Sequence, residues 1–308
     1  MRPIFKKAAA VAQPGGRPPA AVEITPEGVL AAAHQGKSGA GGSPSYAFAA
    51  LPPGAVIPGI EGVNLHEPEV VTAGIRTALD ELSPRKRAVT LILPDACVRV
   101  FVLDFESLPA KTEEAISVLR FRLRKMVPFD VEHGGVSYQV LAQKENECKV
   151  LTAVMPGPIL AEYEAVVHAA GYEPGAVLPS SLAAIETAGE MEAVLAANLS
   201  GTAMTTLIAT GQDLLLYRTL ELPLGDAERI EEIQRGIAVA AAYYEDKLGA
   251  PPQKLYYTGN RDPLEFASWL GEIELPVVEL ASRPESGMLT TLGHESVAAV
   301  TGALVGAG

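Results

Sequence analysis

Residues 89–141 read VTLILPDACVRVFVLDFESLPAKTEEAISVLRFRLRKMVPFDVEHGGVSYQVL and decide the fold class. The segments 89–93 and 98–104 are rich in β-branched and aliphatic residues and predict two strands, in which alternate side chains point to opposite faces. The segment 112–127 has apolar residues at helical spacing, and 136–142 predicts a further strand. Strands and a helix in this order are typical of a mixed α/β protein.

The helix within this stretch has recognisable signals at both ends. Thr112 is expected to be its N-cap, with two glutamates in the first turn that favour the positive end of the helix, and Pro128 is expected to end it. The residues predicted to form its buried side are Ile116, Leu119, Leu123 and Met126.

Outside this stretch the chain also alternates between strands and helices. Residues 20–33 predict a hairpin, residues 193–210 and 213–222 predict strands, and Gly249 is expected to end the longest helix. Further helices are predicted at 67–82, 159–170, 226–248, 263–269 and 295–304, and further strands at 148–154, 255–258 and 276–280. The pattern gives two similar halves, each beginning with a hairpin-rich sheet, and favours an α/β fold with mixed sheets.

Composition and charge exclude several classes of protein. With 308 residues, 48% of them apolar, the chain is not disordered as a whole. A formal charge of −13 argues against a nucleic-acid binder, which needs a basic face to neutralise phosphates. The sequence contains no run of about 18 apolar residues, the length needed to span a bilayer. Any membrane location is therefore expected to come through a partner. Residues 1–19, rich in Pro and Gly, predict a disordered tail, and residues 35–45 predict a flexible loop.

Neither a metal site nor a catalytic site is predicted. Cys97 and Cys148 are expected to be buried thiols, because two isolated cysteines form neither a disulfide framework nor a zinc site. The five histidines have no metal-binding spacing, and Ser180–Ser181 lacks the Gly-x-Ser-x-Gly frame of a nucleophile elbow. We expect a non-catalytic protein.

Several short motifs resemble one known family. They are Leu93-Pro94-Asp95, Leu108-Pro109, the helix end at Arg120–Met126, Val127-Pro128-Phe129-Asp130 and Tyr138. In combination they are similar to the PilM family of type IV pilus assembly proteins, which are actin-like and related to the cell-division protein FtsA. The resemblance implies a two-lobed actin-like (ASKHA, ribonuclease H-like) α/β fold with a small α+β subdomain inserted in the first lobe. It implies a first lobe at 20–185 with the insert at about 96–177, and a second lobe at 186–308.

The resemblance also raises the question of a nucleotide, because actin-like proteins hold ATP between the lobes. Their glycine-containing hairpin loops let backbone N–H groups approach the phosphates. In this chain Thr25 stands where the first lobe of the family has that glycine, and no carboxylate stands at Asn198–Gly201 in the second lobe. The phosphate site is therefore expected to be degenerate. If ATP with Mg²⁺ does bind, the expected contacts are Ser200, Gly201, Thr205, Gly225, Gly259 and Asn260.

The function implied by the resemblance is that of a cytoplasmic scaffold at the inner membrane. It would bind the N-terminal cytoplasmic tail of a single-pass PilN-like membrane protein, alongside other pilus assembly proteins. The candidate contacts on the inserted helix and after it are Arg120, Leu123, Arg124 and Phe129. The basic cluster here comprises Arg120, Arg122, Arg124 and Lys125, and it is otherwise interpreted as a solvated face or as a docking site for an acidic partner or the anionic inner membrane leaflet. The apolar residues are otherwise interpreted as core. Two alternatives stay open: an actin-like ATP-binding protein, ATPase or kinase, and a GspL-like scaffold of type II secretion.

Overall fold

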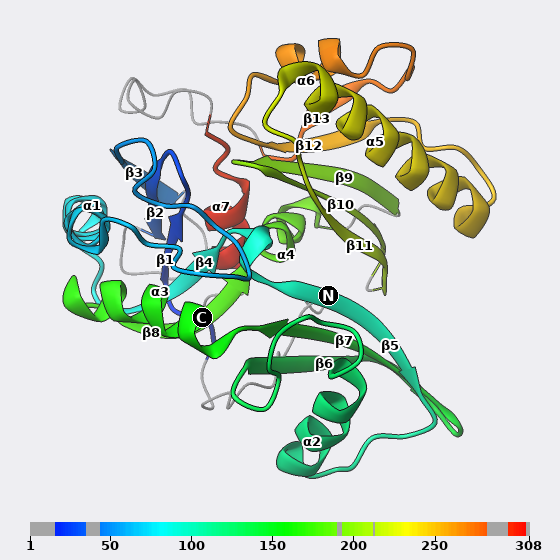
Figure 1. Ribbon diagram of the computed structural model, residues 1–308, viewed down its shortest axis with the longest axis horizontal. Helices are drawn as coiled ribbons and strands as arrows, with labels where there is room; N and C mark the ends of the chain where they lie inside the picture. The colour runs from blue at the N-terminus through cyan, green and yellow to red at the C-terminus, as the bar shows by residue number, and fades with distance from the viewer. Residues whose placement is uncertain (1–15, 35–43, 190–192, 212, 282–294, 306–308) are drawn as a thin grey trace.

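The computed structural model describes residues 16–34, 44–189, 193–211, 213–281 and 295–305. They form two five-stranded sheets, a three-stranded sheet and the helices that cover them (Figure 1). Most of the predicted tail and most of the predicted loop at 35–45 lie outside the described residues.

The first sheet combines antiparallel and parallel strands. Its order is β3 (Pro44–Ala50), β2 (Gly28–His34), β1 (Ala20–Ile24), β4 (Ala88–Leu93) and β8 (Glu173–Pro179). The strands β1, β2 and β3 form an antiparallel meander, whereas β1, β4 and β8 are parallel. All five residues of β1 are buried, as expected for a central strand covered on both faces.

The second sheet repeats this arrangement. Its order is β11 (Asp213–Glu221), β10 (Ala203–Thr210), β9 (Ala193–Ser200), β12 (Leu255–Gly259) and β13 (Val277–Glu279). Again three strands form an antiparallel meander, and β9, β12 and β13 are parallel. The predicted fold of two similar α/β halves with mixed sheets is therefore confirmed.

The third sheet is small and wholly antiparallel. It contains β5 (Arg99–Phe105), β7 (Glu147–Met155) and β6 (Gly135–Lys144), with α2 (Thr112–Leu123) packed on one face. The predicted strands at 89–93 and 98–104 are both present, but they belong to different sheets. The predicted insert at about 96–177 is larger than this small sheet, because β8 pairs with β4 in the first sheet.

The helix α2 differs from its prediction at both ends. Lys111, in extended conformation, occupies the N-cap position, and Thr112 is the first helical residue. The helix ends at Leu123, several residues before Pro128, so the proline is not what ends it. The chain continues through a turn in which the N–H of Met126 donates to the carbonyl of Leu123. Met126 is therefore 40% exposed and not part of the buried stripe.

The remaining helices cover the two large sheets. They are α1 (Pro68–Leu82), α3 (Gly157–Ala169), α4 (Ser180–Ala184), α5 (Asp226–Leu248), α6 (Pro263–Trp269) and α7 (Ala298–Val305), with short 3₁₀ turns at Asp95–Cys97 and Ile185–Ala188. Helix α1 packs on β2 and β3, and α5 packs on β9 and β10. As predicted, α5 ends at Gly249, which adopts a left-handed conformation (φ 76°).

Helix α7 follows the second sheet in the chain but packs on the first. It contacts α4, β1 and β2 (Figure 1). The other end of the described chain is held nearby, because Arg17 Nη2 pairs with Glu186 Oε1 at 3.2 Å. Arg17 lies in the segment predicted as a disordered tail, so this end of that segment differs from the prediction.

Candidate functional site

A small cavity lies where the carboxyl ends of parallel strands from the two large sheets face each other. In open α/β sheets this is the usual position of a binding site. Its volume is about 20 Å³. A cavity needs roughly 10–15 Å³ to hold one water molecule, so there is space for about one. The lining residues include Glu23, Thr25, Ser180, Ser200, Gly259 and Asn260.

A buried carboxylate, Asp95, joins the two large sheets beside this cavity. It follows β4 and is 3% exposed. The backbone N–H of Ser181 donates to Asp95 Oδ1 at 3.0 Å, and the Ser181 hydroxyl donates to Oδ2. From the second sheet, the Asn198 amide donates to Oδ2 at 3.0 Å and the Tyr217 hydroxyl donates to Oδ1 at 2.6 Å. Both carboxylate oxygens are thus satisfied, as a buried charge requires.

A second buried carboxylate, Glu23 in β1, faces the cavity and is 6% exposed. The Ser180 hydroxyl donates to its Oε1 at 2.6 Å. Burial raises the pKa of Glu23 from 4.5 to about 7, and the nearby charges of Asp95 and Glu27 act in the same direction. Glu23 therefore keeps a proton at pH values where ordinary glutamates are ionised.

This shift predicts how stability depends on pH. Between about pH 4.5 and 7 the folded protein holds a proton on Glu23 that the unfolded chain has lost, so stability is full below this window and is lost as pH rises through it. The difference corresponds to about 3 kcal/mol. Glu23→Gln is expected to abolish this decrease in urea titrations across the window, whereas Glu61→Gln on an exposed loop should retain it. An equal decrease in the wild type and in Glu23→Gln between pH 5 and 7 would contradict the assignment to Glu23.

The hairpin turn of the first sheet uses most of its own backbone donors. The N–H of Thr25 donates to the carbonyl of Gly28 at 2.9 Å, and the N–H of Gly28 donates to Thr25 Oγ1 at 3.1 Å. Pro26 has no N–H to offer. In the turn from Thr25 to Gly28, only the N–H of Glu27 is left for another acceptor.

The turn of the second sheet lies directly against that of the first. Gly201 (φ 55°) sits beneath Pro26, whose Cγ is 3.0 Å from the position of a Cβ on Gly201. The Arg229 guanidinium donates to the carbonyl of Gly201, and the Asn260 amide donates to Glu27 Oε1. The two turns therefore contact each other beside the cavity, which Thr25 and Ser200 line.

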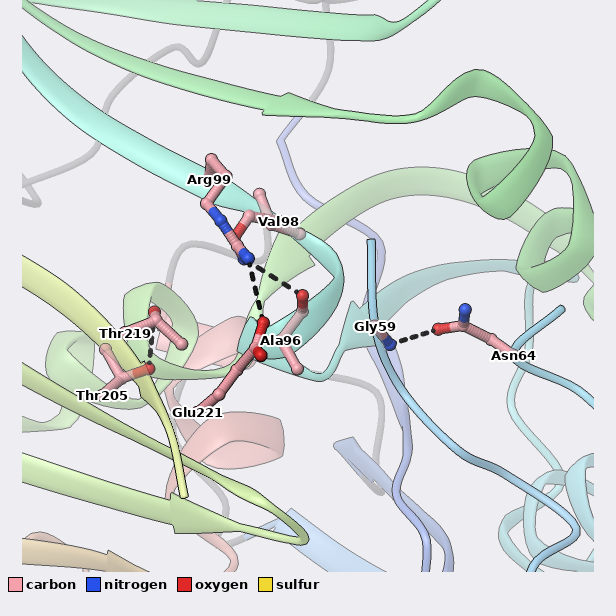
Figure 2. A network of polar contacts seen from close by, with 8 residues as sticks. All are labelled: Gly59, Asn64, Ala96, Val98, Arg99, Thr205, Thr219 and Glu221. Carbon is pink, nitrogen blue, oxygen red and sulfur yellow. Dashed lines mark hydrogen bonds and ion pairs between the residues drawn. The ribbon is translucent and has the colours of Figure 1, made fainter. Parts of the chain in front are cut away.

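A further contact joins the small sheet to the second sheet (Figure 2). The Arg99 guanidinium donates to the carbonyl of Ala96 at 3.2 Å and pairs with Glu221 Oε1 of β11 at 3.4 Å. Beside it, the hydroxyls of Thr205 and Thr219 share a hydrogen bond of 2.9 Å between β10 and β11. Figure 2 shows Arg99 at the start of β5, with its guanidinium directed toward Ala96 and Glu221.

The structure brings together four of the six residues predicted to contact a nucleotide. Ser200, Gly259 and Asn260 line the cavity, and Gly201 follows Ser200 and packs against Pro26. The other two, Thr205 and Gly225, are elsewhere. Thr205 is buried within the second sheet, where it bonds to Thr219, and Gly225 precedes α5 outside the cavity lining.

The residues missed by sequence reasoning are those of the buried network. Asp95, Ser180 and Ser181 were part of recognised motifs but were not predicted to form a site. Each follows a strand of the first sheet, a position that signals a site when polar residues interrupt an apolar run there. Tyr217 lies within β11 and not at the end of a strand, so the sequence around it does not indicate a site.

The four candidate partner contacts have different environments. Leu123 is completely buried against the small sheet, so it is a core residue and not a surface contact. Phe129 is partly buried against the same core. Arg120 Nη2 donates to the carbonyl of Gly134 at 3.2 Å, and Arg124 pairs with Glu132 Oε1 at 2.5 Å.

Comparison with solved structures identifies the fold. The chain is similar to a protein in a structure described as a PilM-PilN type IV pilus biogenesis complex, with 19% identity, a TM-score of 0.67, and coverage of 93% of this chain and 97% of that one. It is also similar to a Bacteroides thetaiotaomicron protein of unknown function with an actin-like ATPase fold, with 14% identity, a TM-score of 0.52, and coverage of 93% and 95%. The cytoplasmic domain of EpsL, an inner-membrane component of the Vibrio cholerae type II secretion system, matches with 12% identity and a TM-score of 0.49, over 88% and 90%. No family model and no curated protein matches the chain.

These likenesses confirm the predicted actin-like fold. Both lobes contain the mixed five-stranded sheet, and the small antiparallel sheet with α2 follows β4 of the first lobe. The resemblance to PilM that the sequence motifs implied is thus found in the three-dimensional structure.

Proposed function

We propose that this actin-like chain is a PilM-like scaffold of a type IV pilus biogenesis platform. It binds the N-terminal cytoplasmic tail of a PilN-like membrane protein and does not hydrolyse ATP. The observation that carries the proposal is the likeness to the PilM-PilN structure, which extends over nearly the whole length of both chains. Because the small sheet and both lobes are all included, the likeness is not confined to an actin-like core.

The hairpin turn of the first sheet supports the proposed loss of nucleotide binding. A phosphate bound between actin-like lobes needs free backbone N–H groups that point toward it. Pro26 lacks this donor, and those of Thr25 and Gly28 are used within the turn. For a triphosphate to enter, Pro26 would have to leave Gly201 and the contact between Glu27 and Asn260 would have to break.

The carboxylates close to the cavity also oppose the binding of a nucleotide. Asp95 and Glu27 lie close enough to Glu23 to raise its pKa, so a triphosphate would enter a region that is already negative. Mg²⁺ would offset part of this repulsion, and ATP with Mg²⁺ at Ser200, Gly259 and Asn260 is the alternative that the first experiment tests.

Isothermal titration with MgATP, followed by a phosphate-release assay, tests the loss of nucleotide chemistry. We expect no saturable heat at millimolar nucleotide and no release above the buffer rate. Pro26→Gly is the informative variant, because it restores one backbone donor and removes the ring that covers Gly201. Saturable binding with turnover by the wild-type protein would contradict the scaffold proposal.

In the proposed role the chain reaches the inner membrane from the cytoplasm by holding its partner. Among the described residues, no helix is long and apolar enough to cross a membrane. Fluorescence anisotropy with a labelled PilN-like tail peptide tests partner capture, with a scrambled peptide as the control. We expect Arg124→Glu and Phe129→Ala to weaken binding, and Arg85→Glu, an exposed charge reversal beyond α1, to leave it unchanged. Equal binding of the native and scrambled peptides would refute the proposal.

A further inference from the structure

The outer side of α2 carries an exposed aromatic ring beside two cations. Phe121 is 69% exposed and Val118 is 37% exposed, and both Arg122 and Lys125 are exposed. Phe121 and Arg122 lie three and four positions after Val118 on α2, and Lys125 follows in the turn, so the four residues occupy one side. A different side of α2, formed by Ala115, Leu119 and Leu123, is buried against the small sheet. We refer to Val118, Phe121, Arg122 and Lys125 as the α2 surface.

The two cations of the α2 surface have no protein partner. Of the four basic residues in this region, Arg120 donates to a backbone carbonyl of the following loop, and Arg124 pairs with Glu132. Within the part of the chain that the structure describes, Arg122 and Lys125 form neither an ion pair nor a side-chain hydrogen bond. Cations near a helix C-terminus are favoured by the helix dipole, but the dipole does not account for an exposed phenylalanine between them and Val118.

The α2 surface also lies on a part of the protein that carries no net formal charge. Residues 99–155 contain eight basic and eight acidic residues, so the formal charge of −13 falls entirely on the rest of the chain. Figure 1 shows α2 on the outside of the small sheet, on the opposite side of the molecule from α5 and α6. An anionic surface can therefore approach α2 without meeting the acidic second lobe.

We propose that the α2 surface docks on an anionic lipid bilayer. Phe121 and Val118 enter the headgroup region with their apolar atoms, and Arg122 and Lys125 pair with lipid phosphates. Aromatic and aliphatic side chains flanked by lysine and arginine are the residues with which helices lie on such interfaces. Phe121 projects from the helix, a shape that a fluid bilayer accommodates without the preformed pocket that a protein partner would have to supply. The contact requires no partner protein, so it is independent of the proposed capture of a PilN-like tail.

Co-sedimentation of the full chain with lipid vesicles tests the docking. Vesicles of phosphatidylcholine with phosphatidylglycerol are compared with vesicles of phosphatidylcholine alone, at low salt. We expect binding to the anionic vesicles only. Each cation contributes about fivefold in affinity, so the double variant R122E/K125E should bind at least about 25-fold more weakly. Phe121→Ser should lose about tenfold.

Two matched variants separate the α2 surface from general changes in charge or hydrophobicity. R85E/K86E makes the same charge change on exposed residues after α1, and Leu264→Ser removes an apolar side chain of α6 that is 82% exposed. Both should bind anionic vesicles like the wild type. The inference is overturned if wild type binds both vesicle types equally or neither, or if R122E/K125E binds like R85E/K86E. Binding to soluble poly-glutamate without binding to vesicles would assign the surface to an acidic protein. No partner is present in these assays, so their failure leaves the proposed tail capture standing.

Discussion

Replacing Asp95 with alanine is expected to lower the free energy of unfolding by about 4 kcal/mol. The carboxylate accepts hydrogen bonds from the Ser181 backbone and hydroxyl, from Asn198 and from Tyr217. Alanine removes this acceptor from the Ser181 N–H and hydroxyl and from the Tyr217 hydroxyl, whereas the Asn198 amide keeps the hydroxyls of Ser180 and Ser181 as acceptors. Each buried donor left unsatisfied costs roughly 1–3 kcal/mol, with partial relief as neighbours rearrange. The loss is large because one side chain serves donors from both lobes.

Urea denaturation measures the change in the free energy of unfolding. Two further variants test whether the change comes from the hydrogen bonds of Asp95. Asp104→Ala removes an exposed aspartate of β5 and should change stability by less than about 0.5 kcal/mol. Tyr217→Phe removes one donor to Asp95 and should cost about 1–2 kcal/mol, with strong coupling between the two sites in a double-mutant cycle. Loss of less than about 1 kcal/mol in Asp95→Ala would mean that the two lobes are held together by other contacts.

Gly302→Ala is expected to destabilise the protein by about 3 kcal/mol through a single methyl group. Gly302 lies in α7, and a Cβ there would fall well inside van der Waals contact with the backbone carbonyl of Ala183 in α4. Because the obstacle is backbone, no side chain can rotate away, and the two helices must separate. This separation also loosens α7 from β1 and β2, which it covers.

Gly74→Ala is the matched control, since it makes the same change inside α1. A Cβ at Gly74 would meet only side-chain atoms, the nearest being Val29 Cγ2 at 3.2 Å. Alanine also has the higher helix propensity, by about 1 kcal/mol, so the net change should be small. Thermal unfolding of the two variants side by side gives the comparison. Equal melting temperatures would show that α4 and α7 are not packed as closely as the structure indicates.

Sequence patterns predicted the local elements well where signals at their ends were strong. The helix from Asp226 to Leu248 was predicted with its bounds, because its apolar spacing is long and Gly249 ends it. The strand β3 was not predicted, since Pro44–Ala50 consists mostly of small or polar residues beside a glycine-rich segment. The end of α2 was placed too late because a proline marks where a helix cannot continue, not where it stops.

The site was only partly predictable because its contacts are distant in the chain. The resemblance to the PilM family pointed to Ser200, Gly259 and Asn260 as nucleotide contacts, and the structure places these three residues around one cavity. Asp95 bonds to residues 86 and 122 positions further on, and nothing in the local pattern of any of the three indicates this pairing. For the same reason 89–93 and 98–104 could be recognised as strands but not assigned to different sheets.

The position of α7 has a consequence for the order in which the protein assembles during synthesis. The sheet that begins at Ala20 receives one of its covering helices from residues 298–305, after the whole second lobe has been translated. At about 5–20 residues per second the ribosome needs tens of seconds to cover this separation. During that interval the strands of the second lobe can complete their own core, while part of the first remains open to chaperones and premature partners. The first lobe is synthesised before the second, but it is thus expected to reach its native state after the second.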